Sequence, residues 1–376
     1  NKFTNKYLNT YNPSYNQIKI LNKITRCRTN KLGIRIYKCN HCQSKIYTYN
    51  SCKDRHCPIC LDYEKELWIE KHKQDILDIN YYHIVISIPK ELKPIFYYNQ
   101  KIMYHQLFKI TNEVLLKVIK ETQNIDIGIT SILHTWSQQT NYFPHIHLLI
   151  TGGGINNLGK WQQITTINEE LIINKIRKRL ITYIKTHELL FYGKYLYLEN
   201  KEKLNQYLDN IKKDKWTIHI NPPYQSVLDI YEYFAKYAFR VCITNERIKN
   251  ITDTHVTFTY KDKNNRNITK ETTIKGEEFI RKFLMHTLPK SFIKIRYYGI
   301  LSGKNKTKKI KKIKLLIKQK KQKEHFLTKI ELLNKINGKD VTTCTFCQKG
   351  TYYLYKEIYS NKSPPKKDKD TIKQTP

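Results

Sequence analysis

The chain has 376 residues and a formal net charge of +36, from 68 Lys and Arg against 32 Asp and Glu. This length suffices for two or three compact domains, and the charge predicts a polyanionic partner, most simply nucleic acid. A membrane surface is a poorer candidate, because the basic residues are spread along the chain instead of lining one amphipathic face. No run of 18 apolar residues and no signal-peptide pattern occurs, so we expect a soluble cytoplasmic protein.

The cysteines divide the chain into three parts. Six of the nine lie near the start, Cys242 stands alone, and Cys344 and Cys347 lie near the end. We therefore expect a cysteine-rich head over residues 1–75, a long middle over 76–303 and a basic C-terminal region over 304–376. Within the last region, the Lys-rich residues 304–323 predict a basic helix or a solvated linker. The Pro-, Lys- and Asp-rich residues from Ser363 onward predict a disordered tail.

The head has the spacing of a zinc site. Cys39-x-x-Cys42 and Cys57-x-x-Cys60 are separated by 14 residues, and each pair can supply two thiolates to a tetrahedral Zn²⁺. A reducing compartment favours metal over disulfides. Four further candidate ligands could form a second zinc site: Cys27, Cys52, His41 and His56. Cys27 and Cys52 could instead be ordinary buried thiols.

Four thiolates close the coordination shell of zinc, so the head is predicted to be structural. It would present basic residues to DNA, namely Lys38, Lys45, Lys53 and Arg55. The pair Cys344-x-x-Cys347 is half of a site, and the sequence does not decide whether other ligands complete it.

Apolar periodicity predicts mixed secondary structure after the head. Helices are expected over 63–77, 95–121, 167–190, 201–213, 227–240 and 277–288, and strands over 81–88, 127–136, 145–150, 216–220, 256–261 and 267–274. These elements lack a regular β-α-β-α rhythm. They favour an α+β fold in which helices cover a mostly antiparallel sheet.

Two histidines lie on one strand. Side chains alternate along a strand, so His145 and His147 share one face, while Ile146, Leu148 and Ile150 point into a core. Two imidazoles on a rigid strand provide half of a divalent-metal site. Because the chain contains 13 histidines, this pattern also arises by chance and needs support from its surroundings.

The preceding strand supplies a third candidate ligand. A polar turn at 137–141 predicts a hairpin, which brings His134 beside the start of the strand that carries His145. Three imidazoles would suit Mg²⁺ or Mn²⁺ when phosphate oxygens complete the shell, and also Zn²⁺ or Fe²⁺. His134 could instead be a buried core histidine, with Gln138 as the main substitute ligand.

Tyr233 and Tyr237 lie four residues apart on the predicted helix over 227–240, so both phenols occupy one helical face. The pattern alone has little specificity in a chain with 29 tyrosines. Tyrosines on an amphipathic helix usually pack against the core with a hydrated hydroxyl. Tyr224 and Tyr231 are alternative phenols.

Several motifs together carry a family resemblance. They are CRTNKLG (27–33), CNHC (39–42), YNSCKDRHCPIC (49–60), LHTWSQ (133–138), PHIHLLITGGG (144–154), YFAKYAFRVCITNERI (233–248) and FIRKFLMHTLPKSFIKIRYYGIL (279–301). In this order the chain resembles the two-tyrosine HUH rolling-circle transposases of bacterial insertion sequences, with their N-terminal zinc-binding domain. The resemblance runs from near the start to about residue 301 and extends to the late C-x-x-C.

The resemblance implies a chemistry and a set of roles. His145 and His147 would bind a catalytic Mg²⁺ or Mn²⁺, and His134 resembles the third ligand of related plasmid relaxases. Tyr233 and Tyr237 would attack single-stranded DNA, giving a 5′-phosphotyrosine link and a free 3′-OH. Lys236 is a candidate for activating a phenol, and Arg240 for binding DNA. The head would hold zinc, and the protein would associate with the bacterial nucleoid.

Two alternatives remain open at this stage. A plasmid replication initiator or relaxase would use the same chemistry at an origin instead of at an element end. A noncatalytic zinc-dependent DNA-binding protein would keep the fold without the reaction. A metal-dependent oxygenase fits poorly, because no H-x-D or H-x-E motif accompanies the histidines and the charge is strongly basic.

Overall fold

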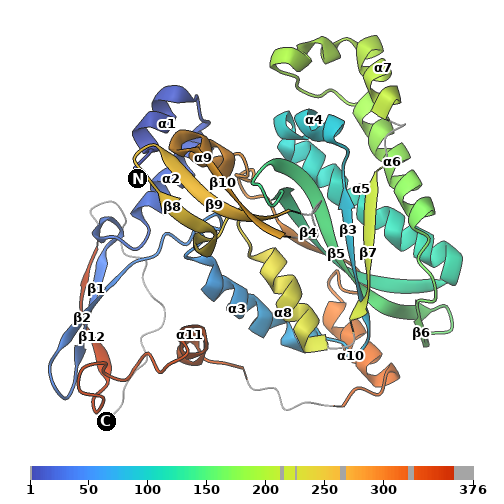
Figure 1. Ribbon diagram of the computed structural model, residues 1–376. Coiled ribbons are helices and arrows are strands. Elements are labelled where there is room, and N and C mark those ends of the chain that lie inside the picture. The colour runs from blue at the N-terminus through green and yellow to red at the C-terminus, as the bar shows by residue number, and fades with distance from the viewer. Residues whose placement is uncertain (1, 212–215, 225–226, 263–267, 321–325, 360–376) are drawn as a thin grey trace. The chain divides into compact units, whose positions relative to one another are not determined.

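The computed structural model describes residues 2–211, 216–224, 227–262, 268–320 and 326–359 (Figure 1). The tail predicted to be disordered from Ser363 lies outside these residues. The described residues form two compact units, one from Pro13–Glu66 and 327–359, the other from Lys2–Asn12 and Leu67–Phe326. The described part of the basic C-terminal region is divided between the units, with residues 304–320 in the second and 327–359 in the first.

The first unit is built around a small antiparallel sheet with strand order β12-β1-β2. Strand β1 (Ile34–Cys39) pairs with β2 (Lys45–Tyr49) and also with β12 (Tyr352–Ile358), from the other end of the chain. The helices of this unit are α2 (Tyr15–Arg26), α11 (Lys329–Asn337) and the first turns of α3 (Leu61–His72). Both α2 and α11 begin with a capping box, at Ser14 and Thr328 respectively.

The second unit contains a central antiparallel sheet with strand order β11-β4-β5-β3-β7. The α+β class with antiparallel sheets is thus confirmed. The strands are β3 (Tyr81–Ser87), β4 (Ile125–Trp136), β5 (Tyr142–Asn156), β7 (Thr217–Tyr224) and β11 (Ile295–Gly299), with β6 (Trp161–Gln163) paired to the far end of β5.

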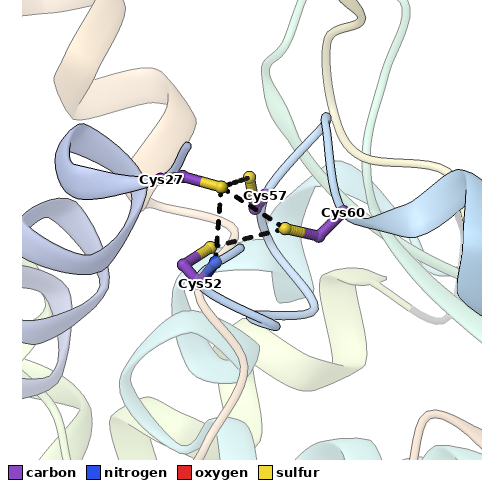
Figure 2. Close-up of side chains that lie close together, drawn as sticks. All are labelled: Cys27, Cys52, Cys57 and Cys60. Atoms are coloured by element: carbon purple, nitrogen blue, oxygen red, sulfur yellow. Dashed lines mark hydrogen bonds between the residues drawn. The ribbon is translucent and has the colours of Figure 1, made fainter. Parts of the chain in front are cut away.

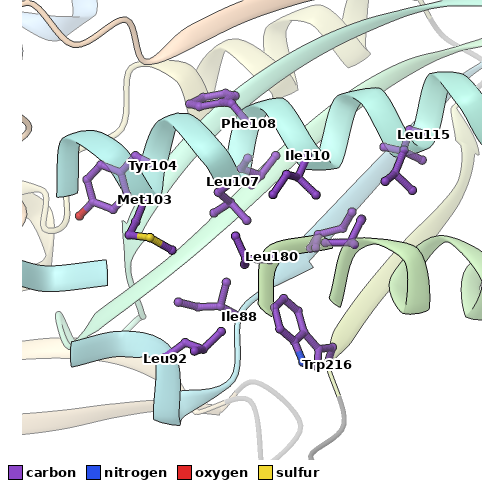
Figure 3. Close-up of a cluster of buried hydrophobic side chains, with 14 of the residues drawn as sticks. Ile88, Leu92, Met103, Tyr104, Leu107, Phe108, Ile110, Leu115, Leu180 and Trp216 are labelled. Atoms are coloured by element: carbon purple, nitrogen blue, oxygen red, sulfur yellow. The ribbon is translucent and has the colours of Figure 1, made fainter. Parts of the chain in front are cut away.

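Helices cover one face of this sheet and form its main core (Figure 1). They are α4 (Lys93–Tyr98), α5 (Gln100–Gln123), α6 (Glu169–Thr186) and α7 (Lys201–Ile211). Figure 3 shows Leu107, Leu115 and Leu180 among the apolar side chains that meet there. Ile146, Leu148 and Ile150 point into this core, as the strand alternation predicts.

The opposite face packs against α8 (Val227–Ala238) and α10 (Lys306–Leu316). Phe234 and Ala238 of α8 are buried there against Ile132 and Leu149 of the sheet. Helix α10 lies in the Lys-rich stretch, and its apolar side is buried in the same cluster. The Lys-rich stretch is therefore helical where it begins, and it is part of the second unit.

A third sheet of order β10-β9-β8 completes the second unit. Its strands are β8 (Ile248–Ile251), β9 (His255–Asp262) and β10 (Ile268–Lys275), followed by α9 (Gly276–Leu284). Helix α1 (Thr4–Thr10) packs on α9, where Lys6 pairs with Glu277.

The helix predicted over 95–121 is divided in two. Asn99 leaves the helical conformation, and its side-chain amide donates to the carbonyl oxygens of Ile95 (3.0 Å) and Leu190 (2.8 Å). The Asn99 side chain thus bonds to a carbonyl group of α4 and to the segment that follows α6. Periodicity did not reveal the break, because the apolar pattern continues through it.

Three glycines near the end of β5, the strand that carries His145 and His147, allow the segments on either side of it to approach closely. A Cβ on Gly152 would lie 2.5 Å from the carbonyl oxygen of Asn80, and one on Gly154 would lie 2.3 Å from that of Asp126. The end of β5 can therefore pack closely against both flanking segments only because it has no side chains there.

Candidate metal centres

His134, His145 and His147 converge on the face of the sheet that meets α8. His134 lies directly opposite His145 in the β4–β5 ladder, as the predicted hairpin requires. Each ring offers a nitrogen within 4.8 Å of those of the other two, and all three side chains are buried. The three imidazoles thus form a group whose size suits one metal ion.

Hydrogen bonds fix the orientation of two of these rings. His145 Nδ1–H donates to the carbonyl oxygen of Phe143 (2.7 Å), and His134 Nε2–H donates to that of Tyr237 (2.6 Å). In a neutral imidazole the other ring nitrogen is then an acceptor, which is the form that binds metals. Burial holds the pKa of His134 well below its usual value and favours this neutral form.

His83 on β3 supports the third ring, and sequence reasoning missed it. Its Nε2 lies 2.9 Å from His147 Nδ1, and the two rings are stacked with centroids 5.2 Å apart. The Asn221 side chain lies 2.9 Å from His83 Nδ1. Burial lowers the pKa of His83 to about 4, with the charge of His219 adding to the effect. The available signal was the alternation of Tyr81, His83 and Val85 along a predicted strand.

Tyr233 and Tyr237 lie above the histidines. Their hydroxyl oxygens are 2.7 Å apart, and the Tyr237 ring centroid lies 4.5 Å from that of His147. Tyr233 makes an edge contact with His83 at 5.6 Å. Because Phe234 is buried against the sheet, helix α8 presents both phenols on its histidine-facing side.

The C-terminal end of α8 is anchored by a cation. Lys294 Nζ donates to the carbonyl oxygens of Ala238 (2.9 Å) and Arg240 (3.2 Å), and it lies 5.1 Å from the ring centroid of Trp136. A positive charge at a helix C-terminus is favourable, because the terminal carbonyl groups carry partial negative charge. Together with the bond from His134 to Tyr237, this contact holds the tyrosines over the sheet.

The histidines and tyrosines line a cavity of about 800 Å³. Cationic side chains from loops and the third sheet also line it, namely Arg240, Arg247 and Lys261. Gln138 also lines it, and the backbone carbonyl oxygen of Gln138 accepts a hydrogen bond from the Arg247 side chain. Sequence reasoning did not single out Arg247 or Lys261: Arg247 lies within the motif quoted over 233–248 without an assigned role, and Lys261 lies in none of the quoted motifs.

One predicted site residue, Lys236, falls outside this arrangement. Lys236 is exposed and is not among the residues that line the cavity, because the helix turns it away from the tyrosine side. The side chains of Tyr224 and Tyr231 lie outside the described part of the structure.

The first unit brings four cysteines together around α2 and the start of α3. They are Cys27, Cys52, Cys57 and Cys60 (Figure 2). Cys27 Sγ lies 3.4 Å from Cys60 Sγ and 3.7 Å from Cys57 Sγ, and Cys52 Sγ lies 3.6 Å from Cys60 Sγ. Tetrahedral Zn–S bonds require sulfur–sulfur distances of about 3.8 Å. The four thiols therefore have the spacing of a structural zinc site.

This grouping differs from the predicted one. Cys39 and Cys42 do not join Cys57 and Cys60, because β1 and β2 place them at the other end of the small sheet. They lie instead with Cys344 and Cys347, in a second cluster whose ligand atoms are within 4.8 Å of one another.

The two histidines of the head do not belong to either cluster. His56 Nδ1 pairs with Asp54 at 2.8 Å, and His41 is exposed. Burial opposes ionisation of Asp54, but the hydrogen bonds from His56 outweigh it and lower the pKa of that carboxyl. His56 thereby fixes the loop between the cysteines. Lys53 and Arg55 of the same loop are exposed.

Comparisons with known proteins match both units. Residues 1–88 match the family described as "Transposase zinc-binding domain", and residues 128–309 match the family described as "Putative transposase". The chain is 30% identical over 304 residues to "Putative transposase y4qJ" of Sinorhizobium fredii (strain NBRC 101917 / NGR234), covering 78% of this chain and 76% of the relative. The chain belongs to the IS91/IS801 family of transposases.

A second relative has a more specific name. The transposase is 25% identical over 298 residues to "Transposase for insertion sequence element IS801" of Pseudomonas savastanoi pv. phaseolicola, covering 77% of this chain and 71% of the relative. No solved structure matches it. The family match and the cysteine cluster of Figure 2 together support structural zinc. Within the described residues, no helix combines the length and apolar character needed to span a membrane.

Proposed function

We propose that this transposase nicks and rejoins single-stranded DNA through a 5′-phosphotyrosine intermediate during rolling-circle transposition of an insertion sequence. The observation that carries the proposal is the placement of two phenols over three imidazoles in one cavity. A nucleophile and a metal-binding group that share one cavity are the parts that phosphodiester transfer needs.

The histidine group fits a divalent cation. His134 and His145 use one ring nitrogen to donate to a backbone carbonyl group, which is the usual outer contact of a metal-binding imidazole. His147 has the equivalent contact with His83. A bound Mg²⁺ or Mn²⁺ would neutralise charge on the scissile phosphate. Three nitrogen ligands leave coordination positions for phosphate oxygens.

The tyrosines would carry the covalent step. One phenol oxygen attacks the phosphorus atom, the bond from phosphorus to the 3′ oxygen breaks, and the departing oxygen takes up a proton while the phenol loses one to solvent. A 3′-OH that later attacks the phosphotyrosine restores a phosphodiester and regenerates the phenol. Because no net hydrolysis occurs, the bond energy is kept for rejoining. The second tyrosine permits a second cleavage while the first end is still held.

Cationic side chains would guide the DNA strand. Arg240, Arg247 and Lys261 line the cavity, and Arg247 is held in place by the carbonyl oxygens of Thr259 and Cys242. Lys53 and Arg55 are exposed cations of the zinc-binding unit and would also contact DNA. Phosphate contacts of this kind make affinity fall with salt concentration.

The test is covalent capture. The full-length protein is incubated with Mn²⁺ and a single-stranded oligonucleotide that contains the element end, and a protein–DNA band is sought under denaturing conditions. The variant Y233F/Y237F should form no adduct. Tyr298→Phe, whose phenol is not among the cavity-lining residues, should react like the wild type.

Three outcomes separate the alternatives. An adduct that persists in Y233F/Y237F refutes the assignment of the nucleophiles. An absence of adducts from the wild type, with intact DNA binding, favours a noncatalytic DNA-binding protein. Cleavage of a replication or transfer origin in preference to an element end favours an initiator or relaxase.

A further inference from the structure

The second cysteine cluster joins the two ends of the chain. Cys39 is the last residue of β1 and Cys42 lies in the turn after it, whereas Cys344 and Cys347 lie some 300 residues later, just before β12. Cys39 Sγ is 3.8 Å from Cys347 Sγ, and Cys42 Sγ is 3.7 Å from Cys344 Sγ. These distances match the sulfur–sulfur spacing of about 3.8 Å in a tetrahedral zinc shell.

The two cysteine pairs form matching turns. In each, the residue after the second cysteine is a glutamine with a left-handed backbone, Gln43 at φ 62° and Gln348 at φ 56°. In each, a backbone N–H donates to a cysteine sulfur at 3.4 Å, from His41 to Cys39 and from Gly350 to Cys347. A left-handed backbone is uncommon in a non-glycine residue. Both turns have one at the same position, directly after the second cysteine, so the two turns share a backbone conformation.

The turns also interlock through their backbones. The Asn40 side chain accepts a hydrogen bond from the Thr351 N–H (2.8 Å), and the Asn40 N–H donates to the Thr351 carbonyl oxygen (3.1 Å). A Cβ on Gly350 would lie 2.5 Å from Cys39 Sγ and 2.6 Å from His41 Cβ. Glycine at 350 therefore lets the second turn reach the first closely enough for all four sulfur atoms to meet.

We propose that Cys39, Cys42, Cys344 and Cys347 bind a second structural Zn²⁺, distinct from the ion at Cys27, Cys52, Cys57 and Cys60. This second ion would hold β12 next to β1. It would thereby fix the segment over 327–359 to the rest of the zinc-binding unit. The match to the transposase zinc-binding family ends at residue 88 and does not include Cys344 and Cys347. The first unit is therefore completed only after the C-terminal segment has been synthesised.

Zinc content tests the proposal directly. The full-length wild type should contain two zinc ions per chain by elemental analysis, and C344S/C347S should contain one. Cys242→Ala is the matched control, because Cys242 is a buried residue of the second unit and belongs to neither cluster, and it should retain two ions. One ion in the wild type, or two in C344S/C347S, would overturn the proposal.

Thiol alkylation of the wild type tests the same site without a variant. Cys42 is exposed and Cys347 is half-buried, so both would react readily if no metal held them. They should be protected in the purified protein and become reactive after a chelator is added, as read by mass spectrometry. Equal reactivity with and without chelator, or a disulfide between the two cysteine pairs, would contradict a zinc clasp.

Hydrogen exchange then tests the clasp. In C344S/C347S the amides of β12 should lose protection while those of β4 keep it. If β12 stays protected in a variant that has lost one zinc, the ion does not hold the strand.

Discussion

The histidine centre and the cysteine clusters place metal-binding groups on very different supports. The histidines sit on a sheet with a large apolar core on one face and a second apolar cluster on the other. In the first unit, by contrast, few aliphatic side chains of the described residues are buried, namely Ile20, Leu21, Leu61 and Leu332. The cysteines themselves form a buried cluster there. We therefore expect the second unit to fold without metal and the first unit to depend on it.

Metal removal should produce the largest difference between the units. A structural zinc contributes about 10–16 kcal/mol, as much as the whole stability of a typical domain. With a chelator, hydrogen exchange should show loss of protection throughout β1, β2 and β12 and continued protection of β3, β4 and β5. If β1 keeps its protection after zinc removal, the two units do not differ in their dependence on metal.

Loss of a histidine ligand should affect activity and leave the fold intact. His147→Ala should lower adduct formation about 10²–10³-fold, since metal stabilisation of the transition state is worth several kcal/mol. Its thermal unfolding midpoint should stay near that of the wild type. His187→Ala, an exposed histidine of the same unit, is the control. A strong loss of stability in His147→Ala would mean that the imidazole is primarily a core residue.

Removing the support behind a ligand should have a smaller effect. His83→Gln should weaken Mn²⁺ binding about 10–100-fold, because His83 orients the His147 ring. Titration calorimetry measures this without DNA or turnover. His105→Gln, at an exposed position on α5, should bind Mn²⁺ like the wild type. Unchanged affinity in His83→Gln would assign His83 to packing alone.

Two exposed lysines should show the smallest and most selective effects. Lys261→Met should weaken binding of single-stranded DNA, because Lys261 lines the cavity. The slope of log affinity against log salt concentration should fall by about 1, the value for one phosphate contact. Lys236→Met should change neither quantity, because that side chain points away. Equal losses in the two variants would show that only the net charge matters.

Much of the histidine centre follows from local patterns. The alternation of His145 and His147 with Ile146, and the turn after Trp136, were enough to predict the face and the pairing with His134. The helix that carries the tyrosines was also predictable, because its apolar residues recur with helical spacing. His83 was not predictable as a partner of His147, because that contact depends on β3 lying next to β5.

The cysteines show where sequence spacing is insufficient. Any two C-x-x-C pairs can share a zinc ion, so the close spacing of the first two pairs suggested one site. The structure separates them: Cys57 and Cys60 lie with Cys27 and Cys52, whereas Cys39 and Cys42 lie with Cys344 and Cys347, because β12 pairs with β1.

The sequence by itself determined the α+β class, the faces of the histidines and tyrosines, and the family. These properties depend on side-chain alternation, helical spacing and the order of motifs, all of which can be read directly from the sequence. Only the tertiary structure decided which cysteines meet, which side chain supports His147 and which cations line the cavity. Those contacts join residues far apart in sequence, and strand order and packing, which local patterns do not encode, bring them together.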